Sequence, residues 1–231
     1  MKNTVLFIAI ISILLITLGL GRYFDAISQN EKLQTAQLYV YPLEKNFIEP
    51  EEVLKLMPIK DSLYKNVDIA ELEQQLEKND YISNAEVYKD LNGHLIAEVA
   101  QYHPIARVMG KTSYYIDING DKKPLSKHFT ERVVLVYGNI TDKNKDQIIH
   151  LLKHIYQEEQ LRKMIAEIHL KNDKLHLRIN EIPALVVMNN NGNTEQQLKK
   201  LKAIYAYLIK NNQQNKYQQI DLRYKNQVVC R

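Results

Sequence analysis

The chain of 231 residues has only one cysteine, Cys230, and only seven glycines. A single cysteine cannot form a disulfide within the chain, so the folded parts must be held together by hydrophobic cores. The sequence contains no Gly-rich phosphate-binding loop and no G-x-S-x-G motif. Nucleotide-dependent chemistry and serine-hydrolase chemistry are therefore not indicated.

The sequence also lacks blocks of like charge. The formal net charge is +4, with Lys and Glu alternating along the chain, and no basic run is interspersed with aromatic residues. This pattern does not support nucleic-acid binding. No motif indicates a small-molecule substrate or a cofactor.

Two histidines have a spacing that can hold zinc. His150 and His154 lie four residues apart on one predicted helix. No glutamate stands beside the first histidine to act as a base, and the sequence offers no obvious third ligand. We therefore interpret both as exposed helix residues and predict no metal site there.

A second pattern has the spacing of the first ligands of a calcium loop, at Asp117, Asn119 and Asp121. A calcium loop requires glycine at its sixth position and glutamate at its twelfth. Here these positions hold Lys122 and His128. The pattern is better explained as a hairpin turn around Asn119-Gly120.

One long run of residues without charge is present, from Thr4 to Gly21. Eighteen helical residues extend roughly 27 Å, enough for the hydrocarbon layer of a membrane. A secretory signal peptide has a shorter apolar region of about 7 to 15 residues and a small-residue cleavage site. We predict a retained anchor, with residues 1–21 forming a cytoplasmic stub and transmembrane helix and residues 22–34 a polar linker. Lys2 and Arg22 flank the span, so the distribution of charge barely decides its orientation. One span followed by a long polar region favours export of that region, with a short cytoplasmic N-terminus.

The hydrophobic pattern of the first part of the exported region predicts the order strand, helix, helix, strand, strand. Alternation from Ala36 to Val40 predicts a strand, and Glu49-Pro50 opens a short helix. Asp68 to Glu71 has capping-box spacing, and Leu72 and Leu76 follow at helical intervals. Two alternating segments then flank Asn92-Gly93, the commonest dipeptide of a tight hairpin turn.

From Pro104 onward the pattern is mostly strand, with two helices. The helices are predicted at residues 143–160 and 194–211, each with an apolar stripe. The chain closes with a strand pair at Tyr217–Tyr224 and Gln227–Cys230. We place a domain boundary near residues 102–104, giving domains at 35–103 and 104–231 and an α+β fold class.

The residues at several points resemble the FtsQ/DivIB family of bacterial cell-division proteins. The similarity is carried by the segment Asn79-Asp80-Tyr81-Ile82-Ser83-Asn84-Ala85-Glu86-Val87, the Pro104-Ile105-Ala106 motif and the terminal Ile220-Asp221-Leu222-Arg223-Tyr224. This resemblance implies a POTRA domain (β-α-α-β-β) behind the anchor and a mixed β-rich second domain. It also implies a non-enzymatic scaffold in the cell inner membrane at the division septum, with most of the chain in the periplasm or cell exterior.

In that family the closing strand engages the FtsB and FtsL pair of single-pass proteins. The resemblance places partner binding here at Arg223 and Tyr224, continued by Lys225, Asn226, Gln227 and Val228. An unpaired strand edge can accept an extended segment of a partner, and Tyr and Arg often dominate interfaces. Tyr224 has an alternative interpretation as a packed strand aromatic.

Two other functions remain open at this point. A POTRA-containing envelope protein of transport or assembly would normally carry repeated POTRA units or a membrane barrel. A membrane-anchored envelope hydrolase would need an activated nucleophile, a metal or paired acids. The sequence shows none of these features.

Overall fold

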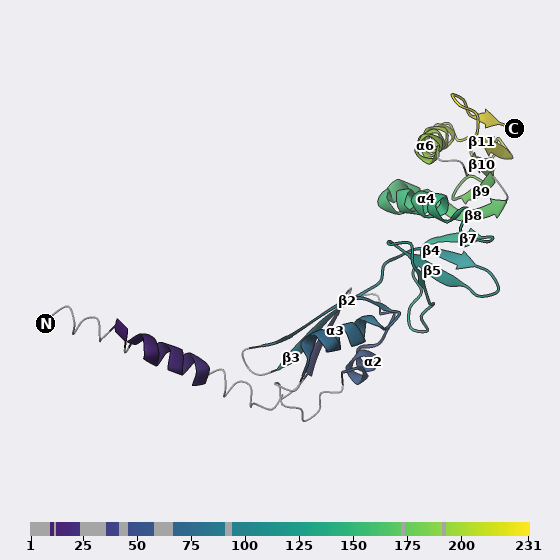
Figure 1. The fold of residues 1–231 in the computed structure, drawn as a ribbon. Coiled ribbons are helices and arrows are strands. Elements are labelled where there is room, and N and C mark those ends of the chain that lie inside the picture. The colour runs from purple at the N-terminus through teal and green to yellow at the C-terminus, as the bar shows by residue number, and fades with distance from the viewer. Residues whose placement is uncertain are drawn as a thin grey trace. The chain divides into compact units, whose positions relative to one another are not determined.

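The structure is a computed structural model that divides into two compact units, Met1–Gln101 and Tyr102–Arg231 (Figure 1). It describes residues 10–11, 13–23, 36–41, 46–57, 67–90, 94–171, 174–190 and 193–231. Each unit has its own sheet and its own hydrophobic core. The two units are therefore described separately.

The first unit has the predicted order of strand, helix, helix, strand, strand, which is confirmed. Its three-stranded sheet has the order β1-β3-β2, with β1 parallel and β2 antiparallel to β3. The elements are β1 (Ala36–Tyr41), α2 (Pro50–Lys55), α3 (Ile69–Glu77), β2 (Ile82–Lys89) and β3 (Leu95–Gln101).

Helix α3 begins and packs as its sequence predicts. The Asp68 side chain accepts a hydrogen bond from the Glu71 backbone N–H at 3.1 Å, which caps the first turn. Leu72 and Leu76 then face the same core as the alternate residues of β2 and β3, and Leu76 is fully buried. The apolar stripe of the helix thus covers one face of the small sheet.

A buried glutamine ties the last strand of this unit to the segment before α2. The Gln101 side-chain oxygen accepts hydrogen bonds from the backbone N–H groups of Phe47 at 2.6 Å and Ile48 at 3.4 Å. Gln101 and Phe47 are at most 1% exposed. The amide therefore satisfies backbone donors that burial would otherwise leave unpaired.

The second unit is built on one mixed nine-stranded sheet. Its strand order is β12-β11-β10-β9-β8-β7-β4-β5-β6, and three neighbouring pairs are parallel: β10 with β11, β4 with β7, and β7 with β8. The strands are β4 (Pro104–Met109), β5 (Tyr114–Asp117), β6 (Lys122–Lys123), β7 (Val134–Tyr137), β8 (Ile165–Lys171), β9 (Lys174–Ile179), β10 (Leu185–Asn189), β11 (Gln219–Asp221) and β12 (Val229–Cys230).

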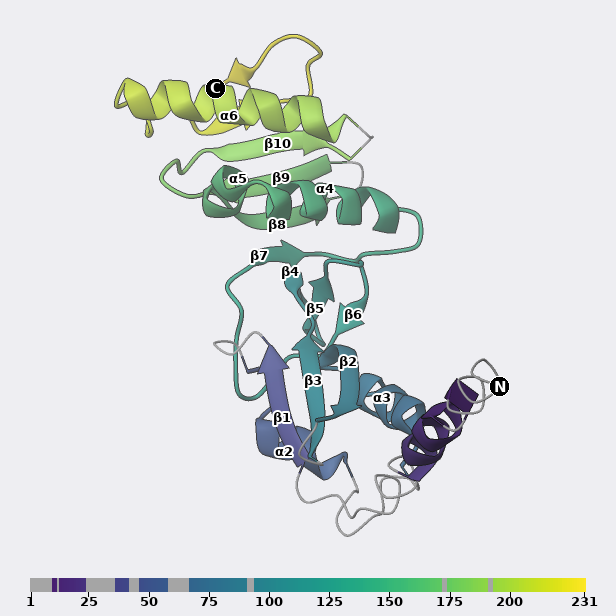
Figure 2. The same ribbon diagram turned by 90° about the vertical axis from the view of Figure 1, so that its left-hand side faces the viewer.

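Three helices, rather than the two predicted, accompany this sheet in the described part of the unit. They are α4 (Lys145–Gln157), α5 (Glu159–Met164) and α6 (Thr194–Lys210), which lie over the same face of the sheet (Figure 2). The predicted helix at 143–160 is interrupted because Glu158 has an extended backbone. The Glu158 carboxylate pairs with Lys202 of α6 at 2.6 Å. The crossovers through α4–α5 and through α6 produce two of the parallel pairs.

The predicted turns have different outcomes. β5 and β6 pair antiparallel around Asn119-Gly120, and Gly120 has a φ of +94°, so this hairpin is confirmed. The Asn92-Gly93 turn lies outside the described residues, although the strands on either side of it pair antiparallel, as a hairpin requires.

At the N-terminus, residues 10–11 and 13–23 are helical. Within the described residues, no helix combines the length and the apolar character needed to cross a membrane. Residues 4–9 and 12 of the predicted anchor lie outside the described part, as does most of the predicted linker. The anchor therefore stays a prediction.

Candidate functional site at the C-terminal edge

Residues 223–228, predicted to bind a partner, form the connection between β11 and β12. The predicted strands at 217–224 and 227–230 are both shorter in the structure, at Gln219–Asp221 and Val229–Cys230. Tyr224, Lys225 and Asn226 form a bend and turn rather than a strand edge. The site is thus a fixed loop beside a short outer strand.

Strand β11 ends earlier than predicted because the next backbone N–H groups bind partners outside the ladder with β12. The Leu222 N–H donates to the Val187 carbonyl at 2.8 Å, which prolongs the contact with β10. The Arg223 N–H donates to the Asp221 carboxylate at 3.1 Å, closing a local turn. The chain therefore leaves the ladder with β12 at this point.

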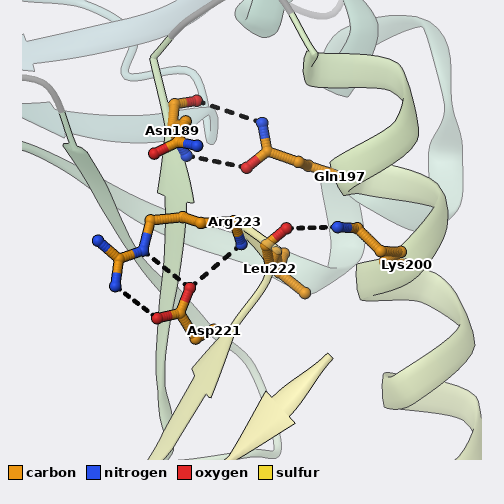
Figure 3. A network of polar contacts seen from close by, with 6 residues as sticks. All are labelled: Asn189, Gln197, Lys200, Asp221, Leu222 and Arg223. Atoms are coloured by element: carbon orange, nitrogen blue, oxygen red, sulfur yellow. Dashed lines mark hydrogen bonds and ion pairs between the residues drawn. The ribbon is translucent and has the colours of Figure 1, made fainter. Parts of the chain in front are cut away.

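Asp221 and Arg223 form a two-pronged ion pair at the base of the loop (Figure 3). The guanidinium donates from Nε to Oδ1 at 2.8 Å and from Nη2 to Oδ2 at 2.6 Å. Asp221 is 3% exposed. The hydrogen bonds from the Arg223 side chain hold the pKa of the Asp221 carboxyl below its ordinary value, in spite of burial, which acts the other way.

Because of this ion pair, the folding stability of the wild type should fall in acid. This part of the pH dependence should be largely absent in Asp221→Asn. Because the folded carboxyl binds its proton less tightly than the unfolded one, its stabilisation is present above the ordinary pKa of 3.8 and is lost as pH falls below it. At neutral pH, Asp221→Asn should cost about 1 to 3 kcal/mol. Urea unfolding of both proteins at neutral pH and at stepwise lower pH would measure it. A difference that stayed constant through the acid range would contradict the assignment.

Helix α6 holds the backbone of the loop in place. The Lys200 ammonium donates to the carbonyls of Leu222 at 2.5 Å and Tyr224 at 2.6 Å. Gln196 donates to the Lys225 carbonyl at 3.3 Å. Burial lowers the pKa of Lys200, while nearby Asp221 acts to raise it. With these carbonyls bound to α6, the exposed side chains from Tyr224 to Gln227 are presented from a fixed backbone.

The position of α6 is itself set by a pair of amide contacts (Figure 3). The Asn189 N–H donates to the Gln197 side-chain oxygen at 2.8 Å, and the Gln197 amide donates back to the Asn189 carbonyl at 3.4 Å. Sequence analysis did not identify Lys200, Gln196 or Gln197. The sequence signal was a Gln four residues before Leu201, on the apolar stripe of α6, and this spacing does not reveal which backbone groups the side chain meets.

The outer strand β12 turns one set of backbone groups away from the sheet. Arg231 and Gln219 exchange both backbone hydrogen bonds, at 3.0 and 3.1 Å, and Cys230 lies opposite Ile220. In an antiparallel pair these hydrogen-bonded positions alternate with positions whose N–H and C=O point outward. The N–H and C=O of Cys230 therefore face the open edge, while its side chain packs against the core, where burial raises the pKa of the thiol.

The two sequence patterns with metal-ligand spacing gain no further ligands among the described residues. The rings of His150 and His154 lie 4.4 Å apart, centroid to centroid. Among the described residues, no group of three or more His, Cys, Asp or Glu side chains is placed to hold a metal ion. The Asp117 carboxylate instead accepts hydrogen bonds from the N–H groups of Asn119 and Asp121, both at 2.9 Å, and so organises its hairpin.

The fold and this edge define a two-domain α+β protein with a POTRA-like first domain. A family model described as POTRA-like domain matches residues 41–100, and one described as FtsQ/DivIB, C-terminal related, matches residues 103–231. The second match spans more than half of the chain. The chain therefore belongs to the FtsQ/DivIB family of cell-division proteins, which confirms the resemblance.

Two known proteins are similar to this chain. The cell division protein FtsQ of Geotalea daltonii is 22% identical over 205 residues, covering 81% of this chain and 72% of that protein. The major extracytoplasmic domain of the trans isomer of the cell division protein DivIB from Geobacillus stearothermophilus is 20% identical, covering 48% of this chain and 97% of that one, with a TM-score of 0.34. Family membership rests on the sequence matches, and it supports a division role over transport or envelope hydrolysis.

Proposed function

We propose that this protein is a membrane-anchored, non-enzymatic scaffold of the bacterial division machinery that recruits other division proteins at the septum. Its partners at the C-terminal edge are the FtsB and FtsL pair. The observation that carries the proposal is the outward-facing backbone of Cys230 on the outermost strand of the sheet, beside a loop whose backbone is fixed.

Strand addition at β12 explains how such a short strand can bind. An extended partner segment would hydrogen-bond to the N–H and C=O of Cys230 and become the next strand of the sheet. The exposed side chains of Tyr224, Lys225, Asn226 and Gln227 would contact its flanks, with Arg223 and Val228 at the two ends of the loop. Holding the loop carbonyls on α6 lowers the entropy lost on binding.

The anchor belongs to the same proposal. The described part of the N-terminal helix exposes large apolar side chains, such as Ile13 at 61% and Leu15 at 63%. A helix that is apolar all round is typical of a membrane span. Thr4 to Gly21 would then hold the protein in the inner membrane, with the two units in the periplasm or cell exterior.

Placing arginine at Ile11 should release the protein from membranes. Ile11 lies near the middle of the apolar run, where Arg costs about 2.5 to 3.5 kcal/mol of insertion free energy. Fractionation of cells expressing Ile11→Arg and wild type would measure this, with Ile11→Leu as the control. The anchor is refuted if wild type is itself fully soluble or if the mature chain begins after Gly21.

Capture of the FtsB and FtsL pair by Tyr224→Ala tests the partner site. Tyr224 is 40% exposed in the fixed loop, and truncating an interface aromatic costs about 2 kcal/mol or more at a hot spot. Tyr207→Ala, which truncates a tyrosine 53% exposed on α6, is the matched control and should bind normally. Equal capture by both variants, with both folded by circular dichroism, would remove Tyr224 from the site.

A further inference from the structure

The formal net charge of +4 hides an unequal division between the two units. Residues 1–101 hold nine Lys and Arg against 15 Asp and Glu, whereas residues 102–231 hold 22 against 12. The first unit is thus formally −6 and the second +10. Strong charge asymmetry between parts of a chain indicates electrostatic partners for each part.

Four of these 22 basic residues lie on one face of the second unit's sheet, opposite the face that the helices cover (Figure 2 shows the helices). Ile168, Leu177 and Val186 are cross-strand partners, fully buried in the core with α4, α5 and α6. Side chains alternate along a strand, so their neighbours in sequence point to the other face. That face carries Arg107, Lys171, Lys174 and Arg178, which we name the basic sheet face.

Ion pairs neutralise part of this face, Asp221 with Arg223 and Glu167 with Arg178, but not the two lysines at the end of β8 and the start of β9. Glu167 is the one acid among the described residues of β4, β7, β8 and β9, and it pairs with His169 at 2.8 Å and Arg178 at 3.6 Å. Lys171 and Lys174 are exposed, are directly opposite each other, and have no ion pair within the described chain. Like charges in register destabilise a sheet unless something compensates them.

In the first unit, the sheet face away from the hydrophobic core carries acidic residues, which have the opposite sign. Glu86 and Glu98 are direct cross-strand partners on β2 and β3, on the face away from buried Val87 and Ala97. The Tyr88 hydroxyl donates to Glu98 at 2.6 Å, and Tyr88 is 43% exposed. No ion pair to Glu86 or Glu98 occurs among the described residues. We name these residues, with Ile96 opposite Tyr88, the acidic sheet face.

We propose that the protein self-associates head to tail, the basic sheet face of one copy receiving the acidic sheet face of a second copy. Two pairs of like charges, each unfavourable within its own sheet, would compensate one another across this contact. The contact joins different surfaces, so each copy keeps one free face of each kind and can bind further copies. This self-association is independent of strand addition at β12.

The mass of the purified full chain in a neutral detergent, measured by light scattering, tests the proposal. In about 0.1 M salt the number of chains per detergent micelle should exceed one, and it should increase with protein concentration. In about 1 M salt it should fall to one chain, because the screening length shortens from about 10 Å to about 3 Å. Association through the anchor alone would persist in salt and would overturn the proposal, as would a single chain under all conditions.

Charge reversal locates the contact. Glu86→Lys and the double variant Lys174→Glu/Arg178→Glu should each weaken self-association by at least about tenfold in low salt. Glu86→Lys also removes a like-charge pair, so its fold should be retained. Mixing the two variants should restore association, because the intact basic sheet face of Glu86→Lys can receive the intact acidic sheet face of the double variant.

The control carries the same change of charge on the helix side of the second unit. Lys145→Glu/Lys210→Glu alters two exposed residues of α4 and α6 and should associate like wild type. The proposal fails if this control weakens association as much as Lys174→Glu/Arg178→Glu does. It also fails if the mixed variants remain single chains, or if wild type remains single and sediments with phosphatidylglycerol vesicles instead.

Discussion

Replacing Leu76 with alanine is expected to destabilise the first unit by about 2 to 5 kcal/mol, the range for a fully buried leucine. Leu76 is 0% exposed and packs with Leu72, Val87 and Val99 between α3 and the sheet. Truncation removes apolar area from the core and leaves a cavity that a small domain cannot easily close. A loss of this size is a large share of the stability of a domain.

Urea or thermal unfolding of a fragment from Gln34 to Gln101 would measure the change. Leu54→Ala on α2 is the matched control, because Leu54 is 38% exposed and its truncation should change stability by no more than about 0.5 kcal/mol. If Leu76→Ala and Leu54→Ala unfold at the same midpoint, α3 does not pack on the sheet as described.

The second large effect is expected on binding, from Cys230→Pro. Proline removes the N–H that Cys230 turns to the open edge, and its ring occupies the space of an added strand. Arg231 exchanges hydrogen bonds with Gln219, and Val229, opposite Asp221, is the next hydrogen-bonded position of β12, so the fold should survive, as is usual for proline on an edge strand. Capture of the FtsB and FtsL pair should fall by at least about tenfold.

Cys230→Ala separates the backbone from the thiol. It keeps the outward N–H and removes only the sulfur, so capture should match wild type. The strand-addition mechanism is wrong if a folded Cys230→Pro protein captures the pair normally. If Cys230→Ala fails as well, side-chain packing rather than the strand edge controls binding.

The first unit could be predicted almost entirely from the sequence because its signals are local. The spacing of Asp68 and Glu71 predicts a cap that the structure forms, and the alternation in β2 and β3 matches the buried face. The role of Gln101 could not be predicted, since it depends on backbone donors 53 and 54 residues away.

The ends of elements in the second unit were harder to predict because long-range contacts set them. The helix at 143–160 breaks at Glu158, which pairs with Lys202 from α6. The closing strand stops at Asp221 because the next donors bind Val187 and the Asp221 side chain. Alternation alone predicts neither outcome.

The local structure of the predicted partner site differs from the one expected from the sequence. Arg223 to Val228 form the connection between two strands, and Asn226 lies in a turn rather than on an open edge. The outward-facing position is Cys230, which only the register with Ile220 identifies. The unequal charge of the two units was readable from the sequence, but it becomes informative only once their boundary and sheet faces are known.

Amide hydrogen exchange of the full chain, with and without the FtsB and FtsL pair, tests the central claim most directly. Strand addition predicts that the Cys230 amide, exposed at the open edge when the protein is alone, becomes strongly protected in the complex, while the Ile220 amide inside the sheet changes little. Stable binding of the pair with no added protection at Cys230 would contradict the account.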